Sequence, residues 1–171
     1  MSSDEAEQLA HASIDPDLFR SVLGNFASGV TVVTAMDDGE PVGLTAQSFT
    51  SLSLDPPLVM FCPTVTSTSW PRIRHARHFA ANILAEGQDA LGIQFARSGS
   101  DKFAGVQWSA GPSGAPLLAG VLAHIDCQIE AVHPGGDHQI VIGRVLHLAA
   151  EADKKPLVYF RSAFESLAPR P

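Results

Sequence analysis

The chain has little positive charge and no long apolar run. Its 171 residues include only 11 Lys and Arg against 18 Asp and Glu, which gives a formal net charge of −7. Nucleic acids are bound through basic surfaces, so neither DNA nor RNA is expected as a partner. No apolar stretch approaches the roughly 20 residues that a membrane helix needs. The acidic N-terminal residues also lack a signal-peptide pattern, and these absences together predict a cytoplasmic protein with no membrane partner.

Cysteine is scarce too, with only Cys62 and Cys127 in the chain. Disulfides are rare in cytoplasmic proteins, which predicts two buried free thiols. His75 and His78 form one histidine pair, and residues 133–138 hold another around a turn. A metal site needs three or more converging ligands. Neither pair has them nearby in the sequence, so no metal is expected.

The usual nucleotide and hydrolase signatures are also missing. The chain contains no G-x-G-x-x-G dinucleotide turn and no G-x-x-x-x-G-K-[ST] phosphate loop. It has no G-x-S-x-G nucleophile elbow either. A nucleotide cofactor would therefore have to be held by a different arrangement of residues.

What is present is an ordinary globular composition, 45% apolar and 17% charged. Residues 1–13 are polar and predict a flexible N-terminal segment, and residues 14–171 predict a single domain. Asp15 and Pro16 are typical of a helix start, and Leu18, Phe19 and Val22 follow at helical spacing. We expect that apolar face to pack on a core. Further helices are predicted over residues 70–76 and 88–97.

Short strands dominate the rest of the chain. The cleanest alternation lies at residues 121–131, which predicts a half-buried strand with Cys127 on one face and Asp126 on the other. Residues 37–39 predict a hairpin turn, and residues 98–120 an irregular loop broken by short pieces. Many closely spaced strands favour an antiparallel, mainly β fold over a doubly wound sheet. The other predicted strands cover residues 30–35, 41–45, 49–54, 58–63, 79–84, 138–148 and 157–160.

Small hydroxylated residues between positions 43 and 70 supply the candidate binding surface. In residues 43–48, Gly43 permits close backbone approach to a flat ring system, and the hydroxyl and amide groups offer hydrogen bonds. The alternative is a Ser/Thr-rich strand with one exposed face. Residues 67–69 precede the helix at 70–76 and are candidates for a phosphate site, the alternative being ordinary N-capping by Ser69. His138 either lines a ligand pocket or belongs to a capped hairpin turn.

Six motifs in order resemble the flavin reductase family of FMN-binding split-barrel proteins, the reductase components of two-component flavin-dependent monooxygenases. Residues 61–64, 126–127 and 135–138 are most similar to the branch serving steroid-degrading hydroxylases of actinobacteria. The motifs that carry the resemblance lie at residues 19–34, 43–49, 53–59, 101–105, 136–138 and 156–161.

The resemblance implies a Greek-key split β-barrel with a few peripheral α-helices, which dimerises and binds one flavin per subunit near the dimer interface. His138 falls near the expected nicotinamide, with Arg161 by the same cleft, although no side chain is required as an essential acid. Gln94 stands where relatives often have a basic residue. The implied flavin contacts are Pro41, Val42, Gly43, Leu44, Thr45, Ala46, Gln47, Ser48, Cys62, Pro63, Thr64, Ser67, Thr68, Ser69, Trp70, Gln94 and Phe95.

The implied activity is reduction of FMN or FAD by NADH, with free reduced flavin diffusing to a partner oxygenase. NADH is favoured over NADPH because no Arg/Lys cluster suggests a site for a 2′-phosphate. The alternative is a non-catalytic flavin-binding or electron-transfer protein on the same barrel. A relative of pyridoxamine phosphate oxidase is disfavoured, because the basic phosphate clamp expected for that ligand is not apparent among so few Lys and Arg residues.

Overall fold

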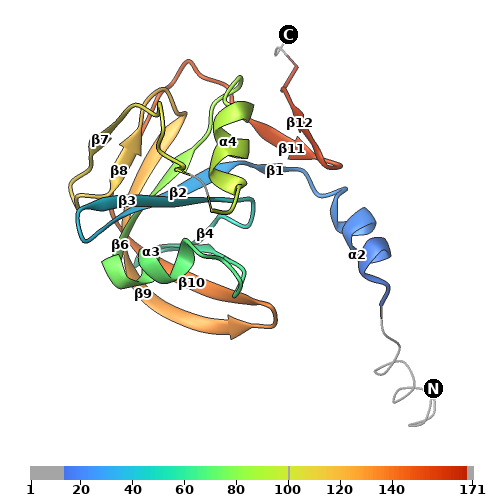
Figure 1. Ribbon diagram of the computed structural model, residues 1–171. Coiled ribbons are helices and arrows are strands. Elements are labelled where there is room, and N and C mark those ends of the chain that lie inside the picture. The colour runs from blue at the N-terminus through green and yellow to red at the C-terminus, as the bar shows by residue number, and fades with distance from the viewer. Residues whose placement is uncertain (1–13, 100, 169–171) are drawn as a thin grey trace.

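A seven-stranded antiparallel sheet forms the body of the computed structural model, which describes residues 14–99 and 101–168 (Figure 1). The strands lie in the order β3-β2-β6-β9-β10-β5-β4. The expected mainly β, antiparallel class is therefore confirmed. These strands are β2 (Thr31–Asp37), β3 (Glu40–Ala46), β4 (Thr50–Leu54), β5 (Pro57–Phe61), β6 (His78–Ile83), β9 (Ala123–Gly135) and β10 (His138–Ala150).

In the described ranges, three helices and two small sheets surround this body. The two predicted helices after residue 60 are confirmed as α3 (Trp70–Ala76) and α4 (Asp89–Ala96). The loop expected at residues 98–120 contains a short hairpin of β7 (Trp108–Ala110) and β8 (Pro116–Leu118). A three-stranded sheet joins β1 (Ser28–Gly29) to β11 (Val158–Phe160) and β12 (Ala163–Glu165), and of these strands the sequence predicted only β11. The segment expected to be flexible, residues 1–13, lies outside the described residues.

The hairpin between β2 and β3 forms where the sequence predicts it. Asp38 and Gly39 occupy its two central positions with φ angles of 49° and 83°. A two-residue turn with both angles positive matches the right-handed twist of the strands it joins, and Asp-Gly tolerates that backbone. This turn fixes the register in which Gly43 of β3 lies opposite Thr34 of β2.

The core is divided between the two faces of β2, because successive side chains of a strand point in opposite directions. Val33 belongs to a cluster built around Phe61, whose ring meets Trp70 and Phe79 edge-on at 5.8 and 5.2 Å between centroids. Val32 belongs to a second cluster. Its other fully or nearly buried members are Val30, Leu84, Phe95, Leu118, Val121 and Leu157.

The alternation expected along β9 is wrong at one position. Asp126 was expected on the open face of the strand, but it is 1% exposed. Ser113, in the loop between β7 and β8, covers it and donates to it from both its backbone N–H and its hydroxyl, at 2.9 and 2.5 Å. A carboxylate is tolerated in the interior when it is hydrogen-bonded. Cys127 is buried as expected, whereas Cys62 is only half-buried, and both are free thiols.

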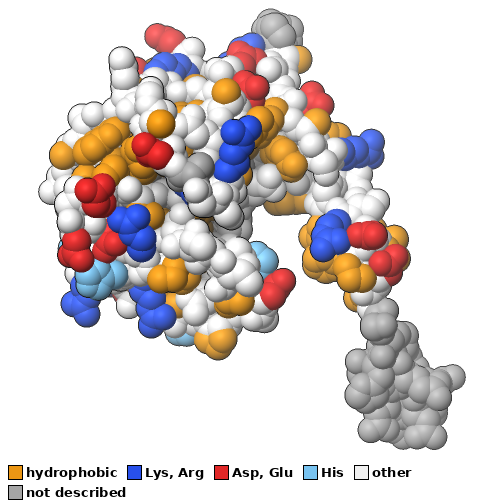
Figure 2. All heavy atoms as spheres, in the orientation of Figure 1, with side chains coloured by type: hydrophobic (Ala, Val, Ile, Leu, Met, Phe, Trp, Pro, Cys, Tyr) orange, Lys and Arg blue, Asp and Glu red, His pale blue; other side chains and the backbone are white. Residues whose placement is uncertain are grey.

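Helix α2 (Pro16–Leu23) begins at the predicted cap, where Asp15 Oδ1 accepts from the Asp17 N–H at 3.1 Å. The expectation that it packs on the core is wrong, because it buries none of its residues in this chain. Residues 14–27, which contain α2, stand away from the barrel and are called the arm below (Figure 1). Apolar side chains are visible on the arm (Figure 2). The four large apolar residues of α2 are 52–57% exposed, namely Leu18, Phe19, Val22 and Leu23.

The arm is attached through the turn after β11. Arg161 donates its backbone N–H to the Gly24 carbonyl at 3.0 Å and its Nε to Asn25 Oδ1 at 2.9 Å. Helix α2 is therefore held at a fixed place beside the barrel, with a space between them. Within the described ranges, none of the helices is long and apolar enough to cross a membrane.

Candidate functional site

A hollow of about 970 Å³ opens on the barrel beside the arm. The end of β3, the segment after β5 and the end of α4 form its walls, and Phe19 and Leu23 of α2 also line it. Its volume is at the upper end of the range of about 300–1,000 Å³ typical of small-molecule sites. Twelve of the predicted residues line it, namely Leu44, Thr45, Ala46, Gln47, Ser48, Cys62, Pro63, Thr64, Ser67, Thr68, Phe95 and His138.

A second, smaller hollow of about 410 Å³ adjoins the first. Thr68 and Lys102 line both hollows and so form their shared wall. The predicted set is thus divided, because four of its members line the second hollow and not the first. These are Pro41, Val42, Gly43 and Ser69.

Lys102 fixes this shared wall. Its ammonium donates to the Gly43 carbonyl at 3.1 Å, to Ser69 Oγ at 3.0 Å and to the Phe95 carbonyl at 3.0 Å. An ammonium has three N–H donors, so its hydrogen bonds are complete. No carboxylate lies within ion-pair distance of it among the described residues. Burial lowers the pKa of Lys102, and a bound anion would offset that effect.

The hydroxyls of the main hollow are ordered by contacts between the two segments. Ser48 Oγ accepts from the Cys62 N–H at 2.8 Å and thereby joins the end of β3 to the end of β5. Thr64 and Thr66 hydrogen-bond each other through their hydroxyls at 3.0 Å. Burial raises the pKa of the Cys62 thiol. The wall is therefore a prearranged row of hydroxyls with a protonated thiol.

Ser69 does not cap α3 with its side chain. The Trp70 N–H instead donates to Ser67 Oγ at 3.1 Å, whereas Ser69 Oγ accepts from Lys102. The capping role that the sequence suggested for Ser69 is thus wrong, and Ser67 performs it. Ser69 is 6% exposed and connects α3 to the loop that carries Lys102.

Gly43 is explained by packing rather than by approach to a ligand ring. A Cβ at this position would lie 2.6 Å from Cε1 of Phe95, which is fully buried. The space beside the Cα of Gly43 is therefore filled by the ring of Phe95 and is not open to a ligand. Phe95 contributes to the hollow from a position fixed against β3.

Three predicted residues line neither hollow. Trp70 is buried and donates from Nε1 to Gln139 Oε1 at 2.6 Å. Gln94 donates from Nε2 to the carbonyls of Lys102 and Ala104, both at 3.0 Å, and so holds the loop over residues 101–105. Arg161 braces the arm and lies over the ring of Phe160 at 5.0 Å. These three side chains therefore do not line the site but hold the segments around it in place.

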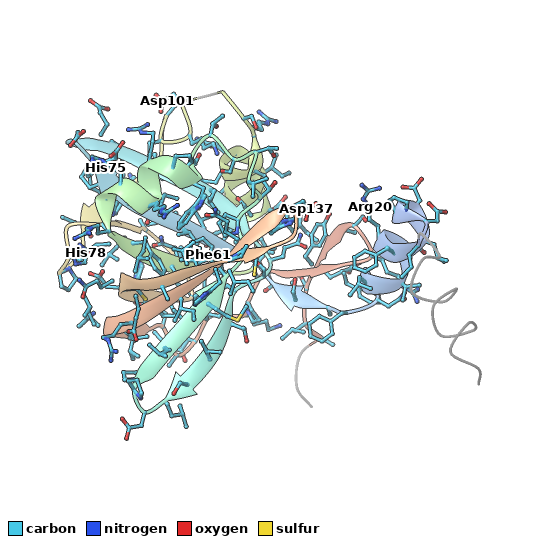
Figure 3. All side chains as sticks on the ribbon, turned by 90° about the horizontal axis from the view of Figure 1, so that it is seen from below. Arg20, Phe61, His75, His78, Asp101 and Asp137 are labelled. Atoms are coloured by element: carbon cyan, nitrogen blue, oxygen red, sulfur yellow. The ribbon has the colours of Figure 1, made fainter. Side chains whose placement is uncertain are left out.

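His138 lines the main hollow from the start of β10. Its Nδ1 is 2.7 Å from Oδ1 of Asp137, and this contact lowers the pKa of the Asp137 carboxyl. Thr64 pairs with His138 in an isolated antiparallel bridge, which attaches the turn to the hydroxyl wall. Figure 3 shows Asp137 at the tip of the β9–β10 hairpin, far from His75 on α3.

A cluster of possible metal ligands lies outside the hollows. Ligand atoms of Asp37, Asp38 and His75 lie within 4.8 Å of one another. Arg72 Nε already donates to Asp37 Oδ2 at 2.7 Å, and His75 Nδ1 is 2.7 Å from Asp37 Oδ1. Both carboxylate oxygens of Asp37 thus have protein partners, and the cluster serves to fasten α3 to the β2–β3 turn.

Sequence reasoning missed six residues of the main hollow: Phe19, Leu23, Thr66, Ala96, Ser98 and Lys102. Phe19 was recognised as part of an apolar helical face, but that face was expected to pack on the core. Lys102 was part of a recognised motif, yet nothing local to residue 102 predicts contact with Gly43 in a distant strand.

Comparison with known proteins gives the family. A model described as flavin reductase like domain matches residues 23–168. The chain belongs to the flavin reductase family. This flavin reductase is 48% identical over 161 residues to HsaB of Rhodococcus jostii, the reductase subunit of a flavin-dependent monooxygenase, covering 94% of this chain and 83% of the relative.

Two further relatives bear on the cofactors. The flavin reductase is 43% identical to SmoA, an FMN reductase (NADH) of Agrobacterium fabrum, over 85% of this chain and 83% of the relative. It also superimposes on the NADH:FAD oxidoreductase SgcE6 of Streptomyces globisporus, solved in complex with NAD and FAD fragments. The TM-score is 0.86 at 38% identity, covering 92% of this chain and 97% of the other. This likeness and the strand order confirm the expected split-barrel fold.

Proposed function

We propose that this protein is an NADH:flavin oxidoreductase that reduces FMN or FAD by hydride transfer and supplies free reduced flavin to a partner monooxygenase. The observation that carries the proposal is the main hollow. It combines a row of small hydroxylated residues, an ammonium with no carboxylate partner in the described part of the chain, and a histidine at the start of β10. The names of the R. jostii, A. fabrum and S. globisporus relatives support the same activity.

Residues 44–48 and 62–64 suit the flavin ring and ribityl chain, because their backbone groups and short side chains offer hydrogen bonds without bulk. Ser67, Thr68 and Lys102 suit the phosphate. Lys102 contributes charge, since its three donors already bond protein atoms. His138 suits the nicotinamide end of the hollow. The donor chemistry of the lining therefore fits a phosphorylated flavin.

The bound cofactors supply the redox chemistry, and the protein binds and orients them. Phe19 and Leu23 of the arm add apolar side chains to the lining of the hollow. No side chain of the hollow has to serve as an essential acid. Release of the reduced flavin and its diffusion to the oxygenase require only moderate flavin affinity, which suits a hollow open at its edge.

The proposal includes a homodimer formed through α2 of the arm. Helix α2 presents Leu18, Phe19, Val22 and Leu23 to solvent, and an apolar face of that kind marks an interaction surface. A second copy of this chain, seated in the space between arm and barrel, would cover that face. Because Phe19 and Leu23 also line the hollow, each flavin would then lie beside the interface of two single-domain subunits, each made of residues 14–171.

The test is a steady-state assay of NADH oxidation with FMN, FAD or no flavin, repeated with NADPH. Oxidation should require added flavin and should be faster with NADH. Anaerobically, NADH should bleach the flavin absorbance. A stable flavin complex that NADH fails to bleach would instead indicate the alternative, a non-catalytic flavin-binding or electron-transfer protein.

A further inference from the structure

The loop over residues 101–106 carries Lys102 to the shared wall of the two hollows. Its internal hydrogen bonds are turn contacts. Asp101 accepts from the Phe103 N–H through Oδ1 at 3.1 Å, and the Val106 N–H donates to the Phe103 carbonyl at 3.0 Å. Both partners of each bond belong to the loop. These bonds therefore shape the loop, but they do not fix where it lies on the barrel.

The side chain of Gln94 attaches this loop to α4. Its Nε2 donates to the Lys102 carbonyl and to the Ala104 carbonyl, both at 3.0 Å. A side-chain amide has two N–H donors, so both are used on the loop. One of the two acceptors is the backbone of the residue whose ammonium lies at the shared wall. Gln94 thus holds the backbone of Lys102 and does not touch its charge.

Helix α4 is itself fixed against β3, so Gln94 is anchored on a rigid element. The next residue, Phe95, is fully buried, and its ring fills the space beside Gly43. The Thr45 hydroxyl also donates to the Gly92 carbonyl at 2.6 Å. Two separate contacts therefore join the helix to the strand that forms a wall of both hollows.

The ammonium of Lys102 reaches the shared wall on a four-carbon side chain, which is flexible unless both of its ends are held. Its charged end is held by three acceptors, on Gly43, Ser69 and Phe95. We propose that Gln94 is a positioning residue that holds the other end, so that the ammonium is in place before the flavin phosphate binds. An ordered site binds more tightly than one that must become ordered on binding. The inference rests on the proposed function and adds a residue to its phosphate end.

This role differs from the direct flavin contact that the family resemblance implied for Gln94. The side chain lines neither hollow, and both of its N–H groups are engaged by the loop. Its effect on the flavin is therefore exerted through Lys102. An effect exerted through that ammonium acts on the phosphate of the flavin and leaves contacts with the ring and the ribityl chain unchanged.

The experiment compares the dissociation constants of FMN and riboflavin by quenching of flavin fluorescence. Gln94→Met keeps the approximate length of the side chain but removes both donors. The FMN constant should rise roughly threefold to tenfold, because two hydrogen bonds that order the loop are lost. The riboflavin constant should stay the same, since riboflavin carries no phosphate.

Gln88→Met is the matched control, because Gln88 also joins two segments through its side chain. It accepts from the Ala85 N–H at 2.9 Å and donates to the Ala119 carbonyl at 3.2 Å, and it lines neither hollow. This variant should leave the ratio of the FMN and riboflavin constants unchanged. Partial unfolding would weaken the binding of both flavins equally, so the ratio separates positioning from a general loss of stability.

A double variant with Lys102→Met separates positioning from direct contact. Because Gln94 acts through Lys102, Gln94→Met should add nothing to the loss of FMN affinity that Lys102→Met already causes. A further loss in the double variant would overturn the inference, as would an equal effect of Gln94→Met on riboflavin or no effect on FMN. FMN binding and NADH oxidation by the unmodified protein test the proposed function separately, because Gln94 is unchanged there.

Discussion

The ring of Phe95 fills the space that a side chain at Gly43 would occupy. The Cα of Gly43 on β3 lies so close to the ring of Phe95 on α4 that an added Cβ would be 2.6 Å from Cε1 and 2.7 Å from Cδ1. The same two residues accept hydrogen bonds from Lys102 through their backbone carbonyls. One contact thus positions the wall of the main hollow and the cation shared with the second hollow.

Gly43→Ala should destabilise the fold by about 1–3 kcal/mol, because a methyl group would overfill a packed core. Urea unfolding at equilibrium measures the change. Phe95→Leu, which shortens the opposing side chain, should partly restore stability in the double variant, so that the two losses are less than additive. Strict additivity would contradict the close packing of the pair.

Lys102→Met should weaken binding of FMN by roughly tenfold or more while changing riboflavin affinity little. The ammonium acts on the phosphate in a partly buried setting, where water screens charge less than at the surface. Isothermal titration with both flavins checks this. Lys154→Met is the control, since Lys154 is exposed and donates to the Gly120 carbonyl away from the hollows. An equal loss for riboflavin would assign Lys102 a structural role alone.

The tether of α3 should make stability depend on pH. The hydrogen bond to Asp37 raises the pKa of His75, and Arg72 followed by His75 lowers the pKa of Asp37. A raised pKa in the folded state means that the stabilisation from His75 is complete below its unfolded pKa, about 6.5, and is lost as the pH rises through the folded pKa.

His75→Asn should therefore reduce the free energy of unfolding more at about pH 5.5 than at about pH 9. Urea titrations at the two values measure the difference. In an Asp37→Asn background the pH-dependent part should disappear, because the partner carboxylate is gone. Its persistence there would assign the effect to another group.

Leu18→Glu with Val22→Glu should dissociate the proposed dimer into monomers, because a charged face on α2 cannot be buried against a second copy. Analytical ultracentrifugation measures the mass. Flavin affinity should fall as well, since Phe19 and Leu23 of the same helix line the hollow. Leu148→Glu, an exposed apolar residue on β10, is the control. A monomeric unmodified protein would refute the proposed dimer directly.

Much of the fold could be predicted because its signals are local. The Asp-Gly turn, the proline at the start of α2 and the runs of β-branched residues each depend on a few neighbours in the sequence. The failures are equally specific. The sequence showed that α2 is amphipathic but not which surface it faces, and the alternation along β9 did not reveal that the distant Ser113 covers Asp126.

The candidate site was likewise predictable only in part. Its hydroxylated segments and their family could be recognised from residues 43–70 and the ordered motifs around them. Three features could not be predicted, because they depend on tertiary contacts between residues that local sequence patterns do not reveal. Ser69 accepts from Lys102 instead of capping α3, and Gln94 and Arg161 hold neighbouring segments instead of lining the site. The expected contacts also separate into two hollows.

The sequence by itself determined the mainly β class, the family and the chemical character of the surface. Backbone conformation and local composition follow from side-chain type and spacing over a few residues. Only the tertiary structure decided that the ring of Phe95 requires glycine at position 43 and that the Lys102 ammonium lies at a shared wall with no carboxylate partner among residues 14–99 and 101–168. It also decided that α2 buries none of its residues. Each of these depends on long-range packing, because it requires strands and loops distant in sequence to meet.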